Sequence, residues 1–115
     1  MVSEQQLYAD AWKASPLAIL TLDEEGVICS ANPAAELIFS MEEGGLKDAP
    51  LTRFVHRLDS GALQAMLDEV RGGKIPNRQE IRFETPRRRE FVTGVSLAPT
   101  PEHQGRSVAV IRDLS

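Results

Sequence analysis

The 115-residue chain has a single cysteine, Cys29, and aromatic residues make up only 5% of it. A lone cysteine excludes an internal disulfide bond and a zinc site built from cysteines. No apolar run approaches the roughly 20 residues that a membrane-spanning helix needs, and the N-terminus lacks the apolar segment of a signal peptide. We therefore expect a cytoplasmic domain without direct membrane contact, or one piece of a larger protein.

An excess of basic residues is also missing, because 13 Lys and Arg stand against 17 Asp and Glu, for a net charge of −4. The acids are concentrated in residues 1–70, and the bases in residues 71–106. Nucleic-acid binding depends on clustered positive charge, so we expect no nucleic-acid partner. The one basic run, Arg87 to Arg89, follows Pro86 and predicts a solvated turn, with a partner or phosphate contact as the alternative.

Catalytic and phosphate-binding motifs are missing as well. His56 and Asp59 stand three residues apart, but no Ser, Cys or Lys is identifiably tied to them as a nucleophile. Asp59 is interpreted as the N-cap of the following helix. Gly72 and Gly73 end a helical pattern instead of opening one, so they do not form a phosphate loop. We expect the domain itself to be non-catalytic and to hold no metal.

The N-terminal segment has the pattern of a short amphipathic helix over residues 1–14. Ser3 and Gln6 have the spacing of a capping box, and the residue before Pro16 disfavours helical dihedral angles. The apolar residues of this helix are Leu7, Tyr8, Ala11 and Trp12. This face either packs on the domain or meets a second copy of the chain.

The next elements are a β-hairpin and two helices. Apolar runs at 17–22 and 27–30 are joined by a four-residue turn that ends in glycine, which is typical of a hairpin. Asn32-Pro33 is a strong helix start, because the side chain can cap the helix and proline needs no donor there. Residues 50–55 are consistent with another helical turn. Residues 60–71 repeat apolar side chains at helical spacing and precede two glycines.

The last third predicts three strands, at 80–85, 91–97 and 108–111. Strands 17–22 and 108–111 are apolar at both alternating positions, so we expect both of their faces to be covered and the two strands to be neighbours in mid-sheet. Strand 80–85 has one polar face and suits an edge. The helices between the hairpin and these strands would cover one face, and the N-terminal helix or a second subunit the other.

Four segments match the motifs of a known family. They are the hairpin from Ser15-Pro16-Leu17 to Val27-Ile28, the helix start Asn32-Pro33-Ala34-Ala35-Glu36, the stretch Phe54-Val55-His56-Arg57-Leu58-Asp59, and the close Arg112-Asp113-Leu114-Ser115. With this element order, the chain resembles the PAS domain over about residues 15–115. PAS domains are sensory modules of histidine kinases, cyclic-di-nucleotide enzymes and transcriptional regulators. Arg57 departs from the family pattern, in which proline is common at that position.

The resemblance implies an α+β PAS fold. Its five-stranded antiparallel sheet has the order 2-1-5-4-3, with helices on one face and an N-terminal helix on the other side or at a dimer interface. This order places the first and last strands in the middle, as the burial pattern also does. Agreement between the local and the global argument strengthens the fold prediction.

The concavity between sheet and helices is the candidate ligand pocket. Its candidate lining residues are Phe39, Phe54, Met66, Phe83 and Val95. Either they simply fill the core, or they hold a small apolar ligand or a cofactor such as haem or flavin. Flavin-photoadduct PAS domains carry cysteine on a helix, whereas Cys29 falls on a predicted strand. Haem-binding members place a histidine on the helix before the third strand, which has none here. His56 is therefore only a weak ligand candidate and His103 a weaker one, and no cofactor is predicted.

The resemblance implies a sensory and dimerisation module of a bacterial signalling protein, with a sensor histidine kinase as the expected parent. A homodimer would form through the helix over residues 1–14, and Asp113 would relay the signal to an output region beyond Ser115. One alternative is a haem- or flavin-bearing gas or redox sensor. Another is an interaction module of a transcriptional regulator or a cyclic-di-nucleotide enzyme, which would use residues 86–89 or the N-terminal helix.

Overall fold

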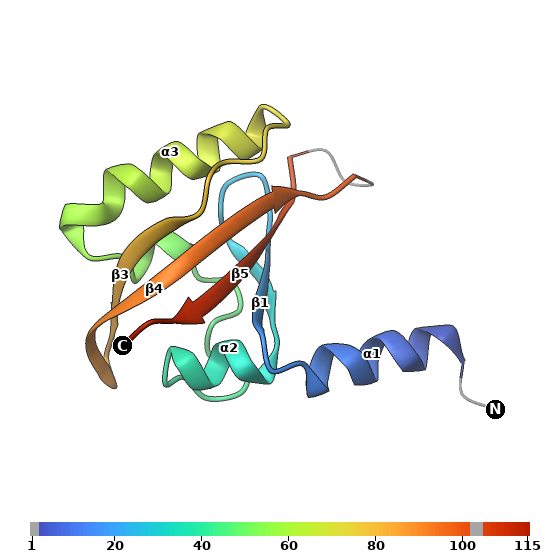
Figure 1. The fold of residues 1–115 in the computed structure, drawn as a ribbon. Helices are drawn as coiled ribbons and strands as arrows, with labels where there is room; N and C mark the ends of the chain where they lie inside the picture. Colours follow the sequence, from blue (N-terminus) through green and yellow to red (C-terminus); the bar gives the residue numbers. More distant parts are fainter. Residues whose placement is uncertain (1–2, 102–104) are drawn as a thin grey trace.

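The structure is a computed structural model that describes residues 3–101 and 105–115. The side chains of Glu4, Gln5 and Tyr8, and the whole of His103, lie outside the described residues. Figure 1 shows the fold. In chain order its elements are α1 (Glu4–Ala14), β1 (Ala18–Leu22), β2 (Ile28–Ala31), α2 (Pro33–Ile38), η1 (Leu51–Arg53), η2 (Arg57–Asp59), α3 (Ser60–Arg71), β3 (Gln79–Thr85), β4 (Arg88–Pro99) and β5 (Ser107–Asp113).

The five strands form one antiparallel sheet in the order β2-β1-β5-β4-β3 (Figure 1). This confirms the predicted topology, and β1 and β5 pair in mid-sheet as their apolar sequences indicated. Strand β3 lies at one rim. Segments before α3 cover part of that rim, because His56 N–H donates to the Arg82 carbonyl and Glu84 N–H donates to the Phe54 carbonyl.

Local sequence signals set the ends of the helices as predicted. The Ser3 hydroxyl accepts the Gln6 N–H at the start of α1. The Asn32 side chain accepts the Ala35 N–H at the start of α2, with Pro33 as the first helical residue. Gly72 follows the last residue of α3. None of the helices among the described residues is long and apolar enough to span a membrane.

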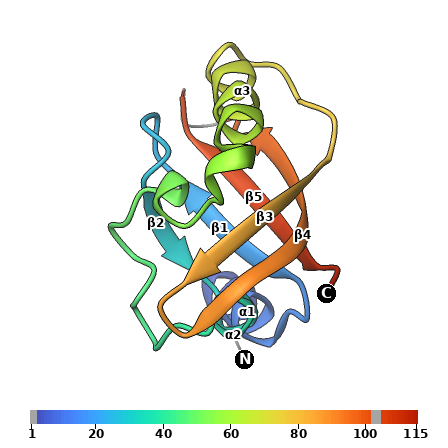
Figure 2. The same cartoon turned by 90° about the vertical axis from the view of Figure 1, so that its left-hand side faces the viewer.

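One face of the sheet is covered by α2, α3 and the two 3₁₀ turns (Figure 2). Strand residues that point toward these helices are buried, and on β5 they are Ser107, Ala109 and Ile111. The core between the two layers is almost entirely hydrocarbon. Burial of each large side chain in such a core contributes about 1.5–3 kcal/mol to stability.

The outer face of the sheet is not covered by α1, which was one of the two covers expected, and cover by a second subunit stays a prediction. Ile19 and Thr21 on β1, and Val108 and Val110 on β5, are half-buried where full cover was expected. Helix α1 leaves the sheet on the side opposite to α3, but it extends away from the domain and does not lie along the strands (Figures 1 and 2). The apolar outer face of the two central strands is therefore open within one copy of the chain.

Candidate functional site

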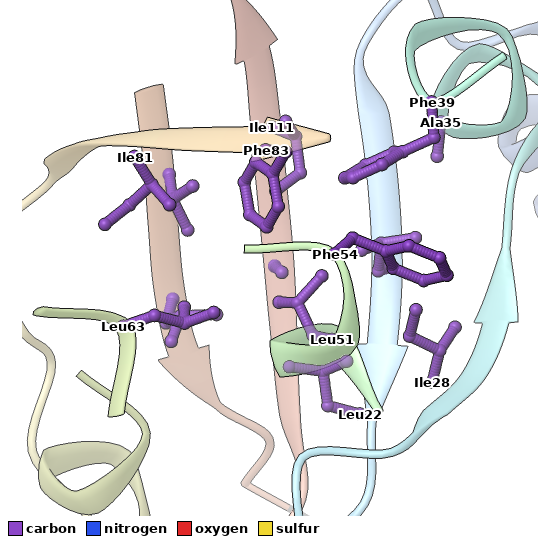
Figure 3. Close-up of a cluster of buried hydrophobic side chains, with 14 of the residues drawn as sticks. Leu22, Ile28, Ala35, Phe39, Leu51, Phe54, Leu63, Ile81, Phe83 and Ile111 are labelled. Atoms are coloured by element: carbon purple, nitrogen blue, oxygen red, sulfur yellow. The ribbon is translucent and has the colours of Figure 1, made fainter. Parts of the chain in front are cut away.

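The structure brings the five predicted pocket residues together in one buried core beneath the helices. The ring of Phe39 contacts those of Phe54 and Phe83, and Figure 3 shows the three side chains converging from α2, the η1 segment and β3. The Phe39 ring meets the Phe83 ring edge-on with centroids 5.1 Å apart, and it is tilted against the Phe54 ring with centroids 6.1 Å apart. Edge-on aromatic pairs of this kind contribute about 0.5–1.5 kcal/mol beyond burial alone.

Phe91 belongs to the same aromatic cluster, although the sequence argument did not include it among the pocket residues. Its ring lies 5.7 Å from Phe39 and 6.2 Å from Phe83. The alternation of apolar residues along 91–97 was the signal that assigns Phe91 to the same face as Val95. These side chains fill the concavity that the sequence argument named as the candidate ligand pocket.

Three hollows on the described part of the surface lie outside this aromatic core. A hollow of about 540 Å³ is bordered by Trp12 at the end of α1, Cys29 on β2 and Glu36 on α2. A smaller one of about 210 Å³ lies between α3 and residues 76–79 and includes Met66 in its lining. The rings of the aromatic core line none of the three.

Asp113, the predicted relay residue, ends β5 in an ion pair. Its carboxylate lies 2.8 Å from a guanidinium nitrogen of Arg88, at the start of β4. The Arg88 side chain also donates to the Ile38 carbonyl, at the C-terminal end of α2, at 2.8 Å. The hydrogen bond and charge of Arg88 hold the pKa of Asp113 below its usual range, and the Ser115 N–H adds to this effect.

The prediction of a solvated basic turn holds for Arg87 and Arg89, which are exposed, but is wrong for Arg88. The guanidinium of Arg88 lies 4.1 Å from the centre of the Phe91 ring and is half-buried. A charge run gives no sign of which member is paired, because the partner Asp113 is 25 positions further along the chain.

His56 and Asp59 belong to a second polar cluster that ties η2 to β3 and β4. The Asp59 carboxylate accepts two hydrogen bonds from the Arg82 guanidinium, at 2.8 and 3.0 Å, and one from the Arg82 backbone N–H. These bonds lower the pKa of Asp59 and raise that of Arg82. Asp59 is the N-cap residue of α3 as predicted, but its carboxylate makes no capping hydrogen bond, because it is turned to Arg82 instead.

Both ring nitrogens of His56 face protein groups. Nδ1 accepts the Leu58 N–H at 3.2 Å, and Nε2 lies 3.3 Å from the Glu90 carboxylate. Within the described ranges, no group of three or more His, Cys, Asp and Glu side chains is placed to hold a metal ion. The surroundings of His56 are those of a structural side chain between a turn and a strand.

The predicted dimer residues lie on α1 with unequal exposure. Leu7 is 57% exposed and Ala11 is exposed, whereas Trp12 is half-buried where the helix meets the domain. The side chain of Tyr8 lies outside the described residues. Helix α1, which carries the exposed members, projects from the side of the sheet opposite to α3 (Figure 1).

The fold and the family motifs agree with the sequence comparison. A family model described as PAS domain matches residues 16–115. Because this match covers most of the chain, the protein belongs to the PAS domain family. A comparison with curated proteins found no match.

Solved structures with the same fold cover nearly the whole chain. A domain of a sensory box sensor histidine kinase/response regulator from Geobacter sulfurreducens has a TM-score of 0.80 at 21% identity, covering 96% of this chain and 94% of its own. The PAS domain of nitrogen regulation protein NR(II) from Vibrio parahaemolyticus has a TM-score of 0.72 at 24% identity, covering 94% and 98%.

A third relative was solved with a small molecule. It is the PAS domain, in complex with ethanol, of a LuxR-family transcriptional regulator from Burkholderia thailandensis, with a TM-score of 0.75 at 14% identity and coverage of 93% and 96%. At these identities the likeness shows the fold alone.

Proposed function

We propose that this PAS domain is a non-catalytic sensory and dimerisation module of a bacterial signalling protein, with a sensor histidine kinase as its parent. In this role it relays a signal to an output region beyond its last strand. The observation that carries the proposal is the open apolar face of β1 and β5. Two of the similar structures come from a sensor histidine kinase and a nitrogen regulation protein, which supports a signalling parent.

The open face is continuous across three strands. Ile19 on β1 lies opposite Val110 on β5, which lies opposite Ser96 on β4. The next row along the strands runs from Thr21 through Val108 to Ala98. Removing this surface from water contributes about 25 cal/mol for each Å² of apolar area. Burial of this face against a partner would therefore favour association.

A second copy of the chain is the partner that we propose for this face. Helix α1 projects from the same side and exposes Leu7 and Ala11. A twofold pair would place the α1 helices and the sheet faces of two copies against each other. Such isologous contacts are the commonest symmetry of soluble homodimers.

The relay follows from the position of β5. This strand contributes Val108 and Val110 to the open face, and it ends at the Arg88–Asp113 ion pair. A shift of β5 at the dimer contact would move the point at which the chain leaves the sheet. A signal can drive such a shift only by binding one arrangement more tightly than the other.

Light scattering on the isolated domain tests the dimer. We expect a dimer for the wild-type domain, and monomers for Trp12→Glu and Val110→Glu. Burial of an unpaired carboxylate costs several kcal/mol, so the dissociation constant should rise by roughly 100-fold or more. Leu37→Glu is the matched control, because Leu37 is 80% exposed on α2, and it should remain dimeric. A wild-type monomer, or unaltered masses for both interface variants, would contradict the proposal.

The relay is tested in a fusion protein in which the kinase region of a sensor histidine kinase is joined to the domain after Ser115. Asp113→Ala should change the autophosphorylation rate, whereas Asp68→Ala, which breaks an exposed pair with Arg71 on α3, should not. Equal rates for the wild type and Asp113→Ala would count against this strand end as the relay.

A small apolar ligand is the second candidate signal, because all five predicted pocket residues converge on one hydrocarbon core. A ligand there would have to displace rings such as Phe39 and Phe54, which now contact each other. A visible absorption spectrum of the purified domain tests for haem or flavin, and native mass spectrometry tests for a colourless molecule. A colourless protein with only the mass of the polypeptide argues against this candidate.

A further inference from the structure

Asn32 is fully buried and uses both ends of its side-chain amide. Its Oδ1 accepts the Ile19 N–H at 2.9 Å and the Ala35 N–H at 3.0 Å. Its Nδ2 donates to the Leu17 carbonyl at 2.8 Å and to the Trp12 carbonyl at 3.3 Å. The oxygen therefore binds β1 and α2, whereas the nitrogen binds the last turn of α1 and the segment that leads from α1 to β1.

Helix α1 has little else to hold its direction. All of its described side chains are exposed except Trp12, which is half-buried. Among the described residues, the bond from Asn32 to the Trp12 carbonyl is the one side-chain hydrogen bond that joins α1 to the body of the domain. Loss of that donor should free the helix to swing about residues 15–17.

The opposite, C-terminal end of α2 is held by Arg88, which also pairs with the proposed relay residue Asp113. Arg88 donates to the Ile38 carbonyl and pairs with Asp113, so it connects the last turn of α2 to the end of β5. The helix between these two contacts has only six residues, Pro33 to Ile38. Figures 1 and 2 place α1, α2 and the C-terminal end of the chain toward the same end of the sheet.

We propose that Asn32 and Arg88 hold the two ends of α2 and make this short helix the link between α1 and the Asp113 end of β5. Asn32 is then the positioning residue for α1. This inference deepens the proposed dimer and relay and rests on them for its role in signalling, but the link itself is a property of one copy of the chain. A short helix that is hydrogen-bonded at both ends is the kind of rigid element through which coupling between two sites is carried.

Trp12 is the only tryptophan in the sequence, so its fluorescence reports on the C-terminal turn of α1 alone. Two variants separate the roles of the Asn32 amide. Asn32→Asp keeps the acceptor oxygen and replaces the donor nitrogen, and Asn32→Ser keeps a capping hydroxyl without burying a charge. Asn77→Asp is the matched control, because Asn77 is exposed. All are made in the Val110→Glu background, so that a change of dimerisation does not alter the signal.

We expect both Asn32 variants to show lower Trp12 anisotropy and red-shifted emission well below the unfolding temperature, and Asn77→Asp to match its parent. An Asn32 with only a structural role would lower the unfolding temperature and leave Trp12 unchanged in the folded state. That result would overturn the positioning role of Asn32.

The link is tested from its other end with Arg88→Met, which leaves Asn32 intact. We expect the anisotropy of Trp12 fluorescence to fall in Arg88→Met. In the reverse direction, we expect the amide resonance of Asp113 to shift in Asn32→Ser. Unchanged Trp12 fluorescence in folded Arg88→Met would overturn the link, even if the Asn32 variants fail to fold. Light scattering in the Val110 wild-type background reports separately on the dimer, so failure of the dimer and failure of the link are distinguishable.

Discussion

Arg88 and Asp113 form a close ion pair, 2.8 Å between charged groups, that joins the first residue of β4 to the last residue of β5. The same guanidinium reaches the last carbonyl of α2 and lies over the Phe91 ring. One side chain therefore connects a helix, two strands and the edge of the aromatic core. The stability of this junction can be measured apart from any signal.

A double-mutant cycle on Arg88 and Asp113 should give a favourable coupling energy of about 1 kcal/mol. Hydrogen bonds to charged groups contribute about 1.5–3 kcal/mol, and partial exposure of both side chains reduces this value. The variants Arg88→Met and Asp113→Asn, alone and combined, are compared by urea unfolding.

The chain offers a control pair for this cycle. Arg71 and Asp68 lie 3.2 Å apart on α3, and both side chains are well exposed. Their coupling should be below about 0.5 kcal/mol, as is usual for exposed pairs on a helix. Equal coupling energies for the two pairs would show that the Arg88 contacts add nothing to an ordinary surface ion pair.

The stability of the domain should fall in acid partly through Asp59. The Arg82 hydrogen bonds lower the pKa of Asp59 in the folded state from its ordinary value of 3.8. The unfolded state therefore binds the proton more readily, so stability is complete above that value and is lost as the pH falls toward the folded-state pKa. Asp59→Asn should flatten this acid limb, as measured by thermal unfolding between about pH 2 and 6.

Asp68→Asn provides the comparison for this pH dependence. Asp68 is exposed and its substitution should leave the acid limb close to that of the wild type. An Asp59→Asn profile parallel to the wild-type profile would mean that Arg82 does not stabilise the folded carboxylate.

Phe39 should dominate the stability of the aromatic core. It is fully buried and contacts the three other phenylalanine rings, so Phe39→Ala should cost about 3–5 kcal/mol in the free energy of unfolding. Leu37→Ala, at an exposed position two residues earlier, should change it by less than about 0.5 kcal/mol. Chemical denaturation of both variants measures the difference, and a small loss for Phe39→Ala would indicate a loosely filled core with room for a ligand.

Much of the fold was predictable from local chemistry. Asn32-Pro33 marked the start of α2, and the glycines after Arg71 marked the end of α3, because capping and termination depend on neighbouring residues. The apolar character of 17–22 and 108–111 placed β1 and β5 in mid-sheet. Their two apolar faces correctly predicted that the strands are central, although none of the described elements of the same copy lies along the second face.

The paired charges could not be predicted in the same way. Asp59 resembles a helix cap in sequence, yet its partner Arg82 lies 23 positions away on β3. The four hydrogen bonds of Asn32 were hidden for a similar reason, since the capping motif accounts for only one of them. Such contacts depend on how distant segments are brought together by the sheet.

Pulsed electron paramagnetic resonance on a spin label at Ser96 tests the central claim most directly. Ser96 lies on the open sheet face beside Val110, and Cys29→Ser removes the only competing thiol. We predict a short distance between the labels of two copies for Ser96→Cys, and a longer one for a label at the exposed Asn77. The absence of any intermolecular dipolar signal at Ser96, in a protein that remains folded, would contradict a dimer built on the β1–β5 face.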